Sequence, residues 1–168
     1  MASCVSFPPI IGDDTHILIL GSMPSVESFR QQQYYAHPRN AFWPIMAEVF
    51  GINMDRNYQQ RCRQLIKNHV ALWDVLKSCH RPGSLDQHID PDSIVANEFD
   101  NFLQHHPHIE RIFFNGGKAE QVFKCYVSPT LDPTFKHITQ IKLPSTSPAH
   151  ASMTFEQKLQ LWQQISVH

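Results

Sequence analysis

The stretch that decides the fold is His16-Ile17-Leu18-Ile19-Leu20-Gly21-Ser22-Met23-Pro24-Ser25. It is a short apolar run that ends at a glycine and continues into small and polar residues. Such a run is typical of a strand buried in a parallel sheet, with both of its faces covered. The residues from Gly21 onward then form the connection at the carboxyl end of that strand.

Three further runs of similar length follow: residues 69–73 are apolar, residues 109–114 are apolar apart from Glu110 and Arg111, and residues 137–143 are mixed. Between and after them lie segments with apolar residues at helical spacing, at residues 41–50, 58–67, 98–104, 118–126 and 154–165. Strands that alternate with helices predict a three-layer α/β/α fold with a central, mostly parallel four-stranded sheet. We expect one domain over residues 1–168. The last helix opens at Thr154 with a capping box that we expect to be imperfect, with Lys158 taken as its closing residue.

The composition fits a globular protein that does not need disulfide bonds for stability. Hydrophobic residues make up 42% of the 168 residues, and the net charge of −1 neither supports nor excludes binding to nucleic acid. The four cysteines, at positions 4, 62, 79 and 125, show no C-x-x-C spacing, and His105-His106-Pro107-His108 is expected to be a solvated helix end. We therefore expect no metal and no cofactor. Without a secretory signal or a long apolar stretch, a cytoplasmic protein with reduced thiols is expected.

The carboxyl ends of the predicted strands carry the candidate functional residues. They are followed by Gly21–Ser25, Asp74, Asn115–Gly117 and Pro144–His150. Ligands of open α/β sheets bind beyond the carboxyl ends of the strands, so these four segments are expected to meet at one site. The segment 31–43 follows the first strand and must lie near the same edge.

Two of these segments have alternative interpretations. The backbone amides after Gly21 could face an anion, or the segment could be an ordinary turn, but it is neither a G-x-G-x-x-G fingerprint nor a P-loop. Asp74 could accept a hydrogen bond from the ring N–H of a base, or it could be a helix N-cap before Val75-Leu76. The local sequence does not separate these alternatives.

The segment Gln33–Trp43 is rich in aromatic and amide side chains. Aromatic faces stack on bases and amides read base edges, and Arg39 could contact a phosphate. Phe42 could stack on a base or anchor the next helix, whereas Trp43 is expected in the core. In the loop Pro144–His150, hydroxyl groups could hold a DNA phosphate and the tip could wedge into a groove, or the loop could be a capped connection to the last helix. A catalytic triad is not evident, since G-x-S-x-G is missing.

Taken in order, three of these segments resemble motifs of the uracil-DNA glycosylase superfamily. Gly21-Ser-Met-Pro24 is similar to its first motif, G-x-x-P after the first strand. Leu143-Pro-Ser-Thr-Ser147 is similar to its second, in a form like that of mismatch-specific uracil/thymine glycosylases, and Phe114-Asn-Gly116 is similar to a third-strand segment of that branch.

Within that superfamily the chain resembles the hypoxanthine-DNA (deoxyinosine) glycosylase family. The shared stretch runs from Gly21-Ser-Met-Pro-Ser25 through Tyr34-Tyr-Ala-His-Pro-Arg-Asn-Ala-Phe-Trp43. Leu72-Trp-Asp-Val-Leu76 with Ser78-Cys79, and Gly83-Ser-Leu-Asp86, extend it. Each motif is weak by itself, whereas the ordered set is specific.

The resemblance implies roles for individual residues. Many superfamily members position the attacking water with Asp or Asn at the third place of the first motif, where this chain has Met23. The resemblance implies that Asn40 takes over that role, that Phe42 stacks on the flipped base, and that Asp74 occupies the base-reading position. Leu143 stands where other branches have His or Asn before the Pro-Ser pair, so stabilisation of the leaving base does not come from a side chain there.

The expected function is that of a monofunctional DNA glycosylase, which flips a deaminated base, hypoxanthine or uracil, out of DNA and cuts its N-glycosidic bond to begin base excision repair. A monomer without a Schiff-base lysine is expected. The alternatives are a catalytically silent nucleic-acid-binding module on the same scaffold, and a small-molecule hydrolase with a metal at the His-rich loop. The expected catalytic residue is Asn40. The expected base-binding residues are Phe42, Asp74, Tyr34, Tyr35, Gly21, Met23 and Asn115, and the expected DNA-binding residues are Ser22, Ser25, Arg39, Lys118, Ser145, Thr146, Ser147 and His150.

Overall fold

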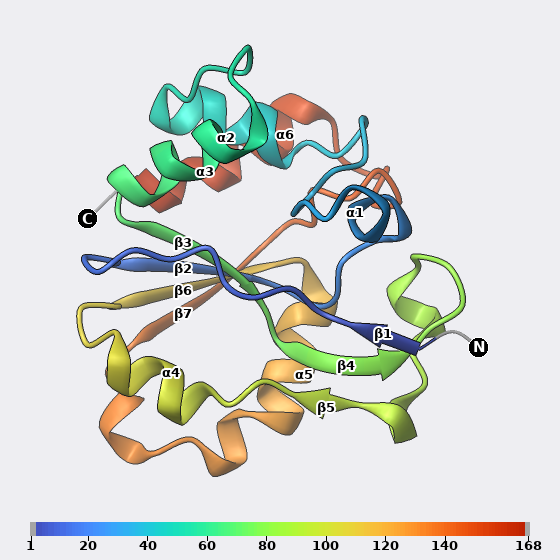
Figure 1. Cartoon of the computed structure of the whole chain (residues 1–168), viewed down its shortest axis with the longest axis vertical. Coiled ribbons are helices and arrows are strands. Elements are labelled where there is room, and N and C mark those ends of the chain that lie inside the picture. Colours follow the sequence, from blue (N-terminus) through green and yellow to red (C-terminus); the bar gives the residue numbers. More distant parts are fainter. Residues whose placement is uncertain (1–2, 167–168) are drawn as a thin grey trace.

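The computed structural model describes residues 3–166 and has a parallel four-stranded sheet at its centre (Figure 1). Its strands are β2 (Ile17–Gly21), β3 (Val70–Asp74), β6 (Arg111–Asn115) and β7 (Thr139–Leu143), in the order β3-β2-β6-β7. All three pairs are parallel. The prediction of a four-stranded parallel sheet is confirmed.

Helices cover both faces of this sheet, as expected for three layers. Helices α2 (Phe42–Phe50), α3 (Tyr58–Lys67) and α6 (Phe155–Trp162) lie on one face. Helices α4 (Phe99–His105) and α5 (Gly117–Tyr126) lie on the other (Figure 1). The short helix α1 (Val26–Gln31) lies beyond the carboxyl edge of the sheet. None of the described helices is long and apolar enough to cross a membrane.

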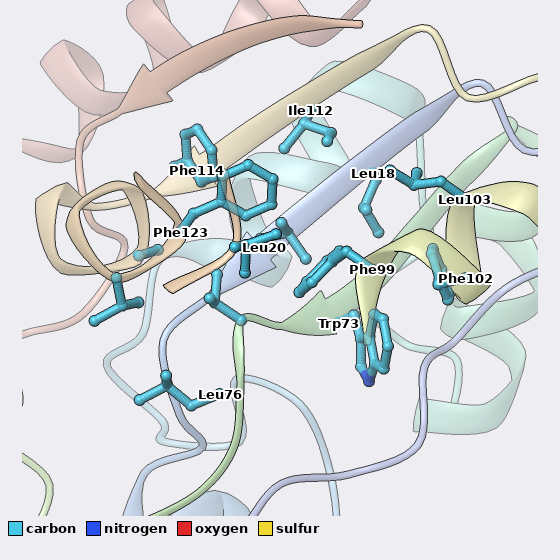
Figure 2. Packing of buried hydrophobic residues seen from close by; sticks show 14 of the residues in the cluster. Leu18, Leu20, Trp73, Leu76, Phe99, Phe102, Leu103, Ile112, Phe114 and Phe123 are labelled. Carbon is cyan, nitrogen blue, oxygen red and sulfur yellow. The ribbon is translucent and has the colours of Figure 1, made fainter. Parts of the chain in front are cut away.

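Strand β2 is apolar and buried along its whole length because it packs against helices on both faces of the sheet, whereas the edge strand β7 is largely exposed. In β2, Leu18 and Leu20 pack toward α4 and α5, with the aromatic rings of Phe99, Phe114 and Phe123 (Figure 2). Ile17 and Ile19, on the opposite face, pack in the second core cluster with residues of α2, α3 and α6. Side chains alternate between the faces with a period of two, so the residue that ends each strand also has a defined face.

A second, antiparallel sheet was not predicted. It consists of β1 (Ser3–Val5), β4 (Leu76–His80) and β5 (Val95–Ala96), in the order β1-β4-β5. The chain passes from β3 into β4 through Val75 alone, so the interpretation of Asp74 as a helix N-cap is wrong. The connection between β3 and β4 is bound to the end of β2, because the Val75 amide donates to the Gly21 carbonyl oxygen at 2.8 Å. Short 3-10 turns complete the chain at Asp86–His88, Pro91–Ser93, Ser128–Thr130, Pro133–Phe135 and Gln163–Ser166.

The start of α6 is better capped than the sequence analysis expected. The residue three places after Thr154 is Gln157, and its side chain accepts from the Thr154 amide at 2.9 Å. The Thr154 hydroxyl accepts in return from the Gln157 amide at 3.2 Å. The capping box is therefore complete, and the expectation of an imperfect cap closed by Lys158 is wrong.

Candidate active site

Three neighbouring strands place their last residues on the same face of the sheet. Gly21, Asp74 and Asn115 continue the alternation of the residues that face α2 and α6, and Gly21 is the register partner of Asp74. A side chain at position 21 would not fit, because a Cβ there would lie 2.6 Å from Asp74 Oδ1 and 3.2 Å from the Tyr35 hydroxyl. Glycine thus leaves room for two polar groups at the carboxyl edge of the sheet.

A cleft opens over these strand ends, with about 580 Å³ of empty space including its mouth. The segments that the sequence analysis brought together all contribute to its wall. The lining residues are Gly21, Ser22, Met23, Pro24, Ser25, Ser28, Tyr34, Tyr35, Asn40, Asp74, Ser84, Asp86, Asn115, Ser145, Thr146 and Ser147.

Phe42 does not line this cleft. It is 0% exposed, and Tyr35 covers its ring, with the two ring centroids 4.1 Å apart and 25° between the planes. A base therefore has no access to Phe42 in this structure, and the expectation that Phe42 stacks on the base needs correction. Tyr35 lines the cleft and lies on the Phe42 ring.

Tyr34 contributes to the wall but its hydroxyl is turned toward the N-terminal segment. That hydroxyl donates to the Pro8 carbonyl oxygen at 2.9 Å, and it lies 3.3 Å from the Phe7 carbonyl oxygen. The Tyr34 carbonyl oxygen accepts from Trp43 Nε1 at 3.0 Å, and Trp43 itself is buried as expected. Tyr34 thus fixes the loop that carries Tyr35.

Asn40 lines the cleft at the start of α2. Its Oδ1 atom accepts from the Phe42 amide at 2.9 Å, which fixes the rotation of the side-chain amide. The second lone pair of Oδ1 and the Nδ2 group remain for other partners. The next residue, Ala41, donates its amide to the Thr146 carbonyl oxygen at 3.0 Å, so the segment around Asn40 is joined to the second-motif loop.

Asn115 acts as a clasp between β6 and the second-motif loop. Its Oδ1 atom accepts from the Thr146 amide at 2.9 Å, and its Nδ2 donates to Thr146 Oγ1 at 3.0 Å. Gly116, with φ of +97°, allows the close approach, since a Cβ there would lie 3.0 Å from Ser145 Cβ. The expected base-binding residue Asn115 thus uses both ends of its amide to position the loop.

The serine hydroxyls expected at DNA phosphates are engaged within the protein. Ser22 donates to Asp86 Oδ1 at 2.7 Å, and Ser25 caps α1 by accepting from the Ser28 amide at 3.1 Å. In the second-motif loop, Ser145 Oγ accepts from the Ser147 amide at 3.1 Å. These hydroxyls shape the two loops.

Three of the expected DNA-binding residues, Arg39, Lys118 and His150, do not line the cleft. Arg39 is exposed, whereas Lys118, in the first turn of α5, and His150, at the end of the second-motif loop, are half-buried. The His150 amide donates to the Ser147 carbonyl oxygen at 3.0 Å.

Asp74 is the acidic group at the base of the cleft, and it is 3% exposed. Its Oδ2 atom and the Tyr35 hydroxyl oxygen are buried without a hydrogen-bond partner among the described residues. Burial raises the pKa of Asp74 to about 7; the negative charge of Asp86 acts in the same direction, and Arg81 opposes it. Burial, with the nearby Asp74, also raises the pKa of Tyr35 above its usual value, so its hydroxyl stays protonated.

Polar residues that the sequence did not single out as site residues hold the loops around the cleft. Arg81, 2% exposed, donates to the carbonyl oxygens of Pro24 and Gly83 and so holds the first-motif loop. Ser84 accepts from the Val26 amide at 2.8 Å, and Lys158 Nζ lies 3.4 Å from the Ser147 carbonyl oxygen. A signal existed for Ser84 and Asp86, because Gly83–Asp86 belongs to the stretch that carries the family resemblance.

Three residues of types that can bind a metal ion lie close together at the other end of the sheet. Potential ligand atoms of Asp14, His16 and His69 lie within 4.8 Å of one another, before β2 and β3. The His16 Nε2 atom already lies 2.8 Å from Asp14 Oδ1. The cluster therefore has no part in the cleft.

The fold, the cleft at the strand ends and the order of its motifs define a class of enzyme. The family model described as "Uracil DNA glycosylase superfamily" matches residues 8–166, and the chain belongs to that superfamily. It is a DNA glycosylase, which hydrolyses N-glycosyl bonds.

Individual relatives agree with this family. A protein named hypoxanthine DNA glycosylase from Methanosarcina acetivorans is 42% identical over 114 residues, which is 67% of this chain and 71% of the relative. A protein of the same name from Methanosarcina barkeri is 40% identical over 114 residues, with the same shares. The solution NMR structure of a candidate uracil DNA glycosylase from Methanosarcina acetivorans matches with a TM-score of 0.77, 33% identity and 99% of each chain covered.

Proposed function

We propose that this enzyme removes hypoxanthine from DNA by hydrolysis, with Asn40 positioning the attacking water. The single observation that carries the proposal is the position of Asn40 in the wall of one cleft with Tyr35 and Asp74. The name shared by the two Methanosarcina relatives supports hypoxanthine as the base. Within the proposal, one domain over residues 1–168 acts as a monomer on DNA in the cytoplasm.

The nucleotide is turned out of the helix into the cleft, which costs a few kcal/mol and least for a weakened pair. Tyr35, supported from behind by Phe42, offers its ring to the base. The loops 21–25 and 145–147 line the mouth and present backbone groups to the DNA backbone.

Hydrolysis then needs a water on the sugar side of the base. Asn40 is held by the Phe42 amide, and the free lone pair of its Oδ1 accepts a hydrogen bond from the water, whose oxygen attacks the sugar carbon C1′. An amide is a weak base, so its contribution is orientation, and orientation supplies a large part of a barrier reduction. Lys158, with Nζ near the Ser147 carbonyl, is outside the cleft wall, which supports a monofunctional enzyme that leaves an abasic site.

The test is release of the base from matched duplexes that contain one hypoxanthine, one uracil or one thymine mismatch, under single-turnover conditions. We expect alkali-sensitive sites at hypoxanthine, and we expect Asn40→Ala to lower the rate at least 100-fold while DNA binding persists. Binding without base release from any duplex by the unaltered enzyme would overturn the proposal and favour a catalytically silent binding module.

Asn40→Ala also removes a hydrogen bond at the start of α2, so the test needs a matched control. Asn53 is exposed, lies outside the cleft, and its Oδ1 atom accepts from the Asp55 amide at 2.9 Å, an identical i to i+2 contact. Asn53→Ala should leave excision unchanged. Equal loss of excision in both variants would contradict a specific role for Asn40.

A further inference from the structure

The carboxyl group of Asp74 is buried at the base of the cleft, and its enclosed oxygen, Oδ2, receives no hydrogen bond from the described residues. Ionised carboxylates buried in proteins accept hydrogen bonds or pair with cations, because an unpaired buried charge is costly. The group therefore suits the neutral acid, which carries one proton to donate.

We propose, on the basis of the glycosylase function above, that Asp74 acts as a general acid that donates its proton to the leaving purine. Asp74 touches the base from the floor of the cleft, on the same face of the sheet as Gly21 and Asn115. Asn40 then positions the water that attacks the sugar, and Asp74 protonates the leaving base. With Asp74 as the acid, the leaving base is stabilised even though Leu143 stands where other branches of the superfamily have His or Asn.

The charged and titratable groups around Asp74 favour the neutral form. Burial raises its pKa to about 7, and the carboxylate of Asp86, held at the cleft by Ser22, adds to the rise. Arg81 is the opposing cation, but it donates to the carbonyl oxygens of Pro24 and Gly83 rather than to Asp74. The hydroxyl of Tyr35 lies beside Gly21 and remains uncharged.

The step balances without a further reactant. The C1′–N9 bond of the nucleotide breaks and its electron pair stays on the base. The Asp74 carboxyl proton moves to a lone pair of the base, for which N7 of the imidazole ring is the available basic nitrogen, so that neutral hypoxanthine leaves and Asp74 becomes a carboxylate. Water adds its oxygen to C1′ and releases one proton, and solvent returns a proton to Asp74.

The pH profile of single-turnover excision of hypoxanthine is the first measurement. With Asp74 as the acid, the rate falls as pH rises through about 7, and Asp74→Asn loses about 100-fold or more together with that falling limb. Asp86→Asn keeps an acceptor for Ser22 but removes the neighbouring charge, so it should move the falling limb to lower pH. A rate that rises through the same pH range would instead indicate a carboxylate that accepts from the base, and would overturn the proposal.

The second measurement uses 7-deazahypoxanthine in the same duplex, since this base lacks the N7 lone pair. The ratio of the rates of unaltered enzyme and Asp74→Asn should fall from about 100 on hypoxanthine to about 1 on the deaza base. A ratio that stays the same on both bases would overturn proton transfer to N7. Thermal unfolding of Asp74→Asn confirms that the variant is folded.

The two proposals fail in different ways. If the unaltered enzyme releases no hypoxanthine, the proposed function itself is wrong. If it releases hypoxanthine and Asp74→Asn keeps both the rate and the falling limb, only the role of Asp74 is wrong.

Discussion

The ring of Tyr35 lies on the ring of Phe42, with the centroids 4.1 Å apart and the planes inclined by 25°. Tyr35 has a φ of +57°, a left-handed conformation that side chains other than glycine rarely adopt. The chain accepts this conformation where the stacked ring and the cleft wall hold it. Backbone conformations of this kind persist where the surrounding structure fixes them, and they gather at functional sites.

This stack predicts different effects of substitution at its two members. Phe42→Leu removes part of a fully buried ring and should lower the free energy of unfolding by about 1–2 kcal/mol, with excision reduced only slightly. Tyr35→Ala should lower the single-turnover rate by 10-fold or more, because the surface for the base is lost. Thermal unfolding and base release measure the two effects. Loss of excision in Phe42→Leu without loss of stability would indicate that Phe42, and not Tyr35, contacts the base.

The clasp between Asn115 and Thr146 predicts a coupled loss of stability and activity. Asn115→Ala removes two hydrogen bonds to the second-motif loop and should cost about 2 kcal/mol of unfolding free energy. The loosened loop should raise the KM for DNA more than it lowers kcat. Thr146→Ser keeps the oxygen that accepts from Asn115 and serves as the control. An Asn115→Ala enzyme with normal stability would contradict the clasp.

The buried carboxyl of Asp74 predicts a stability that depends on pH. Its pKa is raised from 3.8 to about 7, so between these values the folded state keeps a proton that the unfolded state has lost. Folding stability therefore falls as pH rises from about 4 to about 7, and Asp74→Asn removes this loss. The difference in free energy of unfolding between Asp74→Asn and the unaltered protein should shift in favour of the variant by at most about 4 kcal/mol from pH 4 to pH 8. Denaturant unfolding at both pH values measures the difference, and a difference independent of pH would contradict a neutral buried Asp74.

Metal removal should leave the reaction unchanged. Among the described residues, the cluster of Asp14, His16 and His69 lies at the amino ends of β2 and β3, opposite the cleft. Excision of hypoxanthine in excess chelator should therefore match excision without it. A loss of activity that added Zn²⁺ restores would show that a metal takes part in the reaction or stabilises the active enzyme.

The sequence by itself determined the layered fold and the edge at which the site forms. A short apolar run such as Ile17–Leu20 must bury both faces, and parallel strands that do so need helices on either side. The polar residues that follow the runs then meet at the carboxyl edge, which is why Gly21, Asp74 and Asn115 were recognised together. The small sheet that begins at Leu76 was missed, because its strands are short and pair only through contacts distant in the chain.

Only the tertiary structure decided what each of these side chains does. Phe42 and Tyr35 are both aromatic and close in sequence, and the left-handed backbone at Tyr35 determines which of the two faces the cleft. Asp74 lacks a donor because Arg81 donates to the Pro24 carbonyl oxygen and the Ser22 hydroxyl donates to Asp86, and none of these groups is adjacent to Asp74 in the chain. Residue types determine which chemistry is available, whereas the packing of distant segments determines which groups are left without a partner and so remain available to a substrate.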